Sequence, residues 1–199
     1  MIIGNDKPIR VIGYAESSMT QEFVGEISRI RPVTVIETQD FLNDTDPQFQ
    51  YIVSVSVDFA ERKNVVDLVD NLDLDLITVI NDHCLLGNNP APVIQPGTFI
   101  FPFCNIGLGA AIGRHCIISA YSMLGHHSTI GRNCVLRPGV MVTGKSTVGN
   151  NCVFNIRSTV TNHATVVDDV ELMAFANVAK DITVPGQYIG STARKFIGS

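Results

Sequence analysis

Bulky apolar residues recur at every sixth position through the second half of the chain, from Ile94 to Val184. The series continues without a slip through Ile94, Ile100, Ile106, Ile112, Ile118, Leu124, Ile130, Leu136, Val142, Val148, Phe154, Val160, Val166, Leu172, Val178 and Val184. A period of six matches neither the 3.6-residue period of a helix nor the simple alternation of an isolated strand. Because hexapeptide repeats are typical of a parallel β-helix, we predict a mainly β fold for this half.

A second, mostly small series follows four positions after each apolar residue, as in Ala110, Ser122, Ser128 and Ser146. These side chains should also point inward because strand side chains alternate, and larger ones would overfill a narrow interior. Three hexapeptides make one triangular coil, so residues three hexads apart should stack about 4.8 Å apart. About five such coils are expected, each packed only on its neighbours.

Four of the chain's 5 cysteines, Cys104, Cys116, Cys134 and Cys152, fall in this small inward series. Their spacings are multiples of the repeat, and there is no Cys-x-x-Cys pair that would indicate a metal site. A free cysteine packs as a small buried hydrophobe. We therefore expect these four to be core residues, and the sequence leaves Cys84 undecided.

The first ninety residues lack the repeat and alternate between strand-like and helix-like patterns. The expected strands are 9–12, 33–36, 51–57 and 76–80, and the expected helices are 21–30 and 61–72. This order predicts a small α/β, Rossmann-like domain over residues 1–90 with a short parallel sheet, followed by a β-helix domain over 91–199. The loop 13–18 could hold a nucleotide phosphate at a helix N-terminus, although Glu16 would repel it. A purely structural cap is an equal alternative.

Charge and hydrophobicity exclude some functions. The net charge of −5 and the lack of a basic cluster argue against nucleic-acid binding. The first residues have no apolar core of signal-peptide length, and no stretch approaches the roughly 20 apolar residues of a membrane span. We therefore expect a cytoplasmic protein.

Four of the 5 histidines divide into two groups. We expect His83 and His115 to be ordinary exposed turn residues. His126 and His127 are adjacent at a corner of the predicted coil, and steps of one coil from His126 lead to Gly144, Asn162 and Lys180. An extended cofactor could lie along this column, since Gly144 permits close backbone approach and Lys180 could meet a phosphate.

Several motifs together resemble a known family. Residues 124–131 (LGHHSTIG), 137–140 (RPGV) and 142–144 (VTG) are similar to the active coil of the hexapeptide sugar acetyltransferases. The closest groups are the nucleotide-amino-sugar N-acetyltransferases of the bacillosamine-pathway type and the sialic acid O-acetyltransferases. Residues 178–182 (VAKDI), 184–186 (VPG) and 189–194 (IGSTAR) are similar to that family's ending.

The resemblance implies a left-handed parallel β-helix and a homotrimer that binds acetyl-CoA between adjacent subunits. It assigns His126 as general base and His127 to the active site, with no metal. Acetyl transfer to a sugar, in surface glycan synthesis, follows from the same resemblance. Because all the cysteines of the repeat face the core, we expect direct transfer in a ternary complex and no covalent intermediate. The residues implied to contact the cofactor are Gly144, Asn162, Ala174, Lys180 and Arg194, and those expected to contact the acceptor are Gly13, Tyr14, Glu37 and Ser119.

The chain departs from the family pattern at three positions. His127 stands where the family usually has an acid that orients the catalytic histidine. Ser119 replaces an asparagine of the acceptor pocket, and Val135 replaces a second histidine.

Two other functions stay open. A zinc hydratase of the γ-carbonic anhydrase type would use His127, His163 and Asp168 across a subunit boundary. A non-catalytic trimeric scaffold or binding module would explain the missing acid.

Overall fold

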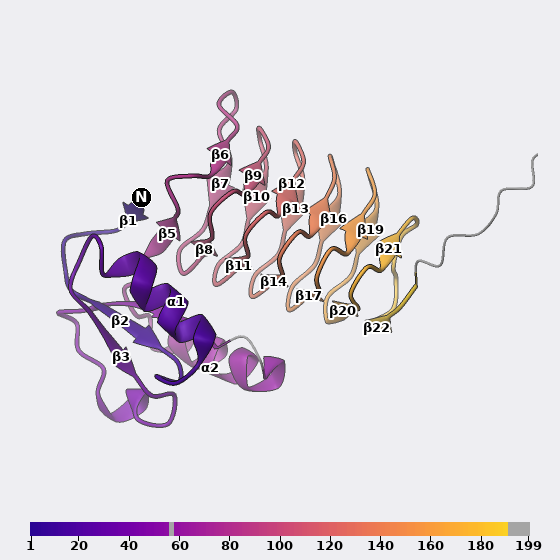
Figure 1. Cartoon of the computed structure of the whole chain (residues 1–199). Coiled ribbons are helices and arrows are strands. Elements are labelled where there is room, and N and C mark those ends of the chain that lie inside the picture. Colours follow the sequence, from indigo (N-terminus) through magenta and orange to yellow (C-terminus); the bar gives the residue numbers. More distant parts are fainter. Residues whose placement is uncertain (56–57, 191–199) are drawn as a thin grey trace, which may run out of the picture.

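A computed structural model of the chain describes residues 1–55 and 58–190, except for the side chain of Leu42. Figure 1 shows a small α/β unit at one end and a long stack of triangular coils extending away from it. Below, the stack is called the solenoid, and residues 1–77 are called the N-terminal unit.

The solenoid has three faces made of two- and three-residue strands that pair in parallel between coils. The first face contains β5 (Thr78–Ile80), β8 (Phe99–Ile100), β11 (Ile117–Ile118), β14 (Val135–Leu136), β17 (Val153–Phe154), β20 (Val170–Leu172) and β22 (Gly186–Tyr188), and β1 (Ile2–Ile3) pairs antiparallel with β5 at its edge. The second face contains β6 (Leu85–Leu86), β9 (Asn105–Ile106), β12 (Met123–Leu124), β15 (Met141–Val142), β18 (Thr159–Val160) and β21 (Asn177–Val178). The third face contains β7 (Val93–Ile94), β10 (Ala111–Ile112), β13 (Thr129–Ile130), β16 (Thr147–Val148) and β19 (Thr165–Val166).

The interior of the solenoid confirms the hexapeptide prediction over most of its length. Positions from Ile100 to Val178 form one buried cluster, and Cys104, Cys116, Cys134 and Cys152 lie inside it as free thiols. Stacking in steps of three hexads is seen directly, for example where Ile112 pairs with Ile130. Burial of these aliphatic side chains in every coil gives the solenoid a continuous apolar core.

The prediction from the hexapeptide repeat is wrong at its last position, Val184. Val184 is 62 % exposed, and Ile182, which the hexad pattern assigned to the small series, is only 7 % exposed. Ile182 bridges to Val166 and Tyr188 pairs with Leu172, so the last coil is two residues shorter than the others. The chain shortens the final turn because Ile182 fills the interior better than a small side chain would.

The solenoid also begins earlier than the repeat suggested. Ile80 pairs with Ile100 and Leu86 with Ile106, so an additional coil precedes Ile94. Two extra residues are accommodated in the loop 87–92, which projects above β6 in Figure 1. Residues 78–80, expected as the fourth strand of the N-terminal sheet, therefore belong to the first face.

The N-terminal unit has a three-stranded parallel sheet in the order β3 (Val33–Ile36), β2 (Ile9–Ile12), β4 (Gln50–Val53). Its helices are α1 (Ser18–Ile27) and α2 (Phe59–Asn71), with a short 3-10 turn, η1 (Phe41–Asn43). Phe23 and Ile27 of α1 pack on Ile9 and Val11, and Val66 of α2 belongs to a separate cluster with Ile12. The helices thus bury different sets of sheet side chains. The Rossmann-like character of this unit stays a prediction.

The N-terminal unit packs on the first face of the solenoid. Phe23 of α1 stacks on Phe99 with ring centroids 4.0 Å apart. Ile117 and Val135, the next outward residues of the first face, are buried in the same cluster. An outward column of large apolar side chains on one face is what allows this docking.

Candidate functional site

His126 and His127 lie in the turn between β12 and β13, where the second and third faces meet. This edge of the solenoid is called the histidine corner. Both side chains are exposed, and their Nδ1 atoms are 3.3 Å apart with the rings nearly perpendicular. His127 adopts a left-handed backbone with φ of 55°, which directs the two neighbouring rings to different sides. The geometry joins the pair through Nδ1 and leaves each Nε2 for other partners.

Two glycines make room for these rings. A Cβ atom at Gly144 would lie 2.6 Å from Nε2 of His126, and a Cβ at Gly109 would lie 2.9 Å from Cδ2 of His127. The ring of His126 therefore covers the following coil, and the ring of His127 covers the preceding one. Any side chain at Gly144 would displace the Nε2 atom of His126, so this glycine fixes where that nitrogen is presented.

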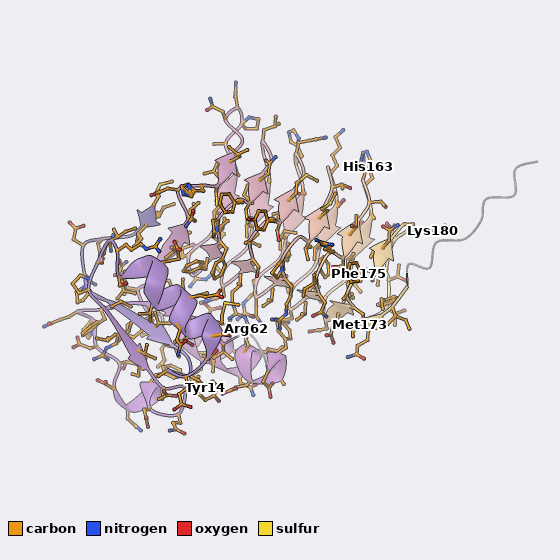
Figure 2. The ribbon with its side chains drawn as sticks, viewed as in Figure 1. Tyr14, Arg62, His163, Met173, Phe175 and Lys180 are labelled. Carbon is orange, nitrogen blue, oxygen red and sulfur yellow. The ribbon has the colours of Figure 1, made fainter. Side chains whose placement is uncertain are left out.

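The predicted cofactor column is present in part. The backbone N–H of Lys145 donates to the carbonyl of His126 over 2.9 Å, and that of His163 to Gly144 over 3.2 Å. Asn162 and Lys180 are exposed further along the column, and Figure 2 shows His163 and Lys180 on the same side of the solenoid. Ala174 is exposed at another corner, between the first and second faces, and Arg194 lies outside the described residues.

Three of the predicted acceptor residues lie together in the N-terminal unit. The Ala15 N–H donates to the Glu37 carboxylate over 3.0 Å, and the Tyr14 hydroxyl donates to the Glu61 carboxylate. The bond to Glu61 is the main reason that the pKa of Tyr14 is raised. Gly13 is close-packed, because a Cβ there would lie 2.0 Å from the Ser54 hydroxyl.

A cleft of about 440 Å³ opens beside Tyr14 and the start of α1. Asp58 and Glu61 are its charged lining residues, and among the residues that the structure describes no lysine or arginine lines it. Carboxylates of this kind accept hydrogen bonds from ribose hydroxyls, whereas the N–H groups at the start of α1 could meet a phosphate.

Ser119 is not part of this cleft. Its side chain is only 6 % exposed at the corner between the first and second faces. Val135 is also fully buried, beneath the N-terminal unit. Figure 2 places Tyr14 far from His163 and Lys180, so a single chain does not bring the acceptor residues of the N-terminal unit to the histidine corner.

The prediction that His115 is an exposed turn residue is wrong. Its side chain is fully buried, and its Nε2 lies 2.9 Å from Oδ1 of Asp70 on α2. Burial lowers the pKa of His115 to about 4, although the bond to Asp70 acts in the opposite direction. Partial burial alone would raise the pKa of Asp70, but hydrogen bonds from His115 and Arg114 hold it below its usual range.

Arg62 of α2 completes this buried contact. It is fully buried and donates to the carbonyls of Val53, Val55 and His115. Arg132 adds ion pairs of 2.8 Å to Asp67 and 2.9 Å to Asp70. We call this group the α2 anchor. The sequence contained a signal for this group. Arg114 and Arg132 are one coil apart, and Asp67 and Asp70 lie on one side of the predicted helix.

The proposed zinc ligands do not meet within the chain. His127 and His163 are at the histidine corner, whereas Asp168 is at the corner between the third and first faces. The Asp168 carboxylate accepts from the backbone N–H of Asn150 at 2.7 Å and from its amide at 3.1 Å. Among the described residues, no group of three or more His, Cys, Asp or Glu side chains could hold a metal ion. Nor is any described helix long and apolar enough to cross a membrane.

Comparisons with known proteins agree with this architecture. The profile described as "Bacterial transferase hexapeptide (six repeats)" matches residues 109–144, which contain the two histidines. No curated protein sequence matches the chain significantly.

Solved structures of similar fold include GDP-perosamine N-acetyltransferase from Caulobacter crescentus in complex with CoA and GDP-perosamine. It has 15 % identity and a TM-score of 0.79, over 92 % of this chain and 93 % of that one. The acetyltransferase domain of PglB from Neisseria gonorrhoeae, in complex with acetyl coenzyme A, has 16 % identity and a TM-score of 0.55 over 87 % and 93 % of the two chains. WeeI from Acinetobacter baumannii has 14 % identity and a TM-score of 0.56 over 86 % and 94 %.

These likenesses extend over the N-terminal unit as well as the solenoid. They confirm the predicted fold, a left-handed parallel β-helix of the hexapeptide-repeat type preceded by a small α/β unit. At such low identity they establish the fold alone.

Proposed function

We propose that the chain is an acetyltransferase that moves an acetyl group from acetyl-CoA to the amino group of a nucleotide-linked sugar. The observation that carries the proposal is the ring of His126, which is exposed at the histidine corner and presents Nε2 over Gly144. It is supported by the fold, which is similar to that of proteins solved with CoA and GDP-perosamine or with acetyl coenzyme A.

The reaction needs a base beside the attacking amine. The amine nitrogen attacks the thioester carbonyl, the C–N bond forms, and the C–S bond breaks to release the CoA thiolate. Nε2 of His126 takes the proton that the amine loses and returns it to the thiolate. Imidazole suits this role because its ordinary pKa of about 6.5 lies near neutral pH.

His127 positions this base. For Nε2 of His126 to accept a proton, its Nδ1 must carry one, and Nδ1 of His127 is the group 3.3 Å away that can accept that hydrogen bond. His127, as a neutral imidazole, thus fixes the tautomer of His126 that an acid fixes in the family that the chain resembles.

A homotrimer would complete the site. Large apolar side chains are exposed at the corner between the first and second faces, including Phe103, Tyr121, Ile156 and Phe175, with exposures of 53 %, 67 %, 47 % and 55 %. Phe103 and Tyr121 stack at 5.1 Å between centroids. We propose that a second copy covers this corner with its own histidine corner. Ala174 of one copy would then lie beside the column of Gly144, Asn162 and Lys180 of the other, and acetyl-CoA would bind between them.

The nucleotide of the acceptor is assigned to the cleft beside Tyr14 in the N-terminal unit. Glu61 and Asp58 would accept from ribose hydroxyls, and the start of α1 would face the phosphates. In a trimer, the sugar would reach a histidine corner supplied by a neighbouring subunit.

The test is mass-spectrometric detection of acetylated product from acetyl-CoA with a panel of UDP-, dTDP- and GDP-linked amino sugars. His126→Ala should reduce turnover about 10²- to 10⁴-fold, as expected for loss of a general base. His163→Ala is the matched control, because it removes an exposed histidine from the same corner without touching the pair. Turnover that survives in His126→Ala would refute the assignment of the base. Binding of acetyl-CoA without product from any acceptor would favour a non-catalytic binding module.

A further inference from the structure

A second, larger cleft lies where the N-terminal unit stops covering the first face of the solenoid. Its volume is about 690 Å³, and it is bounded by the first turn of α2 on one side and by β17, β20 and β22 on the other. This size is within the usual range for sites that bind small molecules. Within one chain it is separate from His126, because the histidine corner is formed by the other two faces.

One wall of the cleft is apolar. Val153, the next outward residue after Val135 on the first face, is 8 % exposed and lines the cleft together with Phe59. Beyond Val153 the outward residues of the same column become polar, at Glu171 and Gln187. The apolar docking surface of the first face thus ends inside the cleft and gives way to hydrogen-bonding groups.

The polar side chains on the floor hold one another in place. The Glu171 carboxylate accepts from the Asn155 amide at 3.0 Å and from the Gln187 amide at 2.7 Å. These bonds use the amide N–H groups and leave the oxygens of Asn155 and Gln187 available as acceptors. Three planar polar side chains beside an apolar wall form a surface on which a sugar ring can place its hydroxyls and its C–H face.

Negative charge predominates in the cleft. Three carboxylates, those of Asp58, Asp169 and Glu171, line it together with two cationic side chains, Lys63 and Arg137. Lys63 is paired with Asp67 at 3.2 Å. Asp169 protrudes at a corner with φ of 58°, and within the described part of the chain its carboxylate has no hydrogen bond or ion pair. The excess of carboxylates favours hydroxyl and ammonium groups in this cleft.

We infer that this cleft binds the ring of an amino sugar, with its hydroxyls on the floor and its ammonium group at Asp169. The inference rests on the proposed function only for the choice of ligand. Because the ammonium group lies at Asp169 and not at a histidine corner, this surface is a sugar site apart from the one at which the acetyl group is transferred. A bound ring would lie between α2 and the solenoid, so it would contact both regions of the molecule.

Binding can be measured without acetyl transfer. The probes are D-glucosamine, N-acetyl-D-glucosamine and D-glucose, titrated into protein with methyl-labelled valine and followed by NMR. We expect glucosamine to shift the methyl resonances of Val153 and Val170 and to bind at least about tenfold more tightly than the two uncharged sugars. Asp169→Asn should remove most of this preference, and asparagine tolerates the left-handed backbone at that position.

Glu22→Gln is the matched control, since it removes an exposed carboxylate from α1, outside the cleft. Equal binding of the three sugars, shifts confined to other valines, or an unchanged preference in Asp169→Asn would overturn the inference. Acetyl transfer by a protein that shows no binding in the cleft would refute the inference while leaving the proposed function standing. Binding in the cleft by a protein that shows no transferase activity would support the inference and count against the proposed function.

Discussion

The solenoid and the N-terminal unit are held together by different kinds of interaction. In the solenoid each coil repeats the last, and its interior is a continuous apolar cluster from Ile80 to Ile182. The N-terminal unit is attached by interactions that occur once, among them the buried Arg62 and the ion pairs of Asp67 and Asp70 with arginines of the solenoid. Repetition makes a structure predictable from sequence spacing, whereas the docking contact also depends on residues of α2, such as Arg62 and Asp70, that lie outside the repeat.

The largest effect is expected from the α2 anchor. Arg62→Met should lower the free energy of unfolding by about 3 kcal/mol, because the buried carbonyls of Val53, Val55 and His115 lose their common donor. Chemical denaturation would measure the loss, and hydrogen exchange should show it in the N-terminal unit. Lys63→Met, which changes the partly exposed neighbouring residue, should cost well under 1 kcal/mol. Equal losses in both variants would show that the anchor does not hold the two regions together.

Acid should weaken the same contact. Because the pKa of His115 falls to about 4 in the folded chain, the folded state resists protonation, and the unfolded chain binds a proton near pH 6.5. Stability from this group is complete above pH 6.5 and is lost as the pH falls toward 4, by on the order of 3 kcal/mol. The low pKa of Asp70 acts in the same direction at still lower pH.

His115→Gln should flatten the change between pH 6.5 and 4, which a series of denaturation curves would measure. A wild-type stability that does not change over this range would contradict the buried, neutral state of His115.

The shortened last coil can be tested with a pair of substitutions. Ile182→Ala should destabilise the chain by about 2 kcal/mol, because it removes a buried side chain, whereas Val184→Ala should stay within about 0.5 kcal/mol. The strict hexapeptide repeat predicts the reverse order, so thermal denaturation of the two variants decides between the registers.

The smallest effect concerns thiol chemistry. Cys84 is half-buried beside Cys104, and hydrogen bonding with that thiol lowers the pKa of Cys84 to about 7. A thiol reagent at neutral pH should therefore modify Cys84 rapidly in the folded protein and leave Cys116, Cys134 and Cys152 unmodified, since they are fully buried. Peptide mapping would identify the modified thiol, and Cys84→Ser should abolish the fast phase. Rapid labelling of the buried thiols would argue against a continuous core.

The candidate site was predictable as far as the repeat reaches. Counting one coil at a time from His126 led to Gly144 and Asn162, and backbone bonds in the structure confirm that stacking. The 3.3 Å approach of the two Nδ1 atoms and the room made by Gly109 could not be read from spacing, because they depend on backbone angles in the turn. His115 was misjudged for a related reason, since its turn is covered by a helix from a distant part of the sequence.

By itself the sequence determined the solenoid, its interior residues and the corner that carries His126 and His127. It could do so because each coil packs on its neighbours in the same way, and the spacing alone therefore assigns a direction to most side chains of the repeat. Only the tertiary structure decided where α2 docks, how the first and last coils depart from the repeat, and where the cleft beside Glu171 opens. Those features arise from contacts between segments far apart in the chain, whose geometry depends on shape and charge and not on a period.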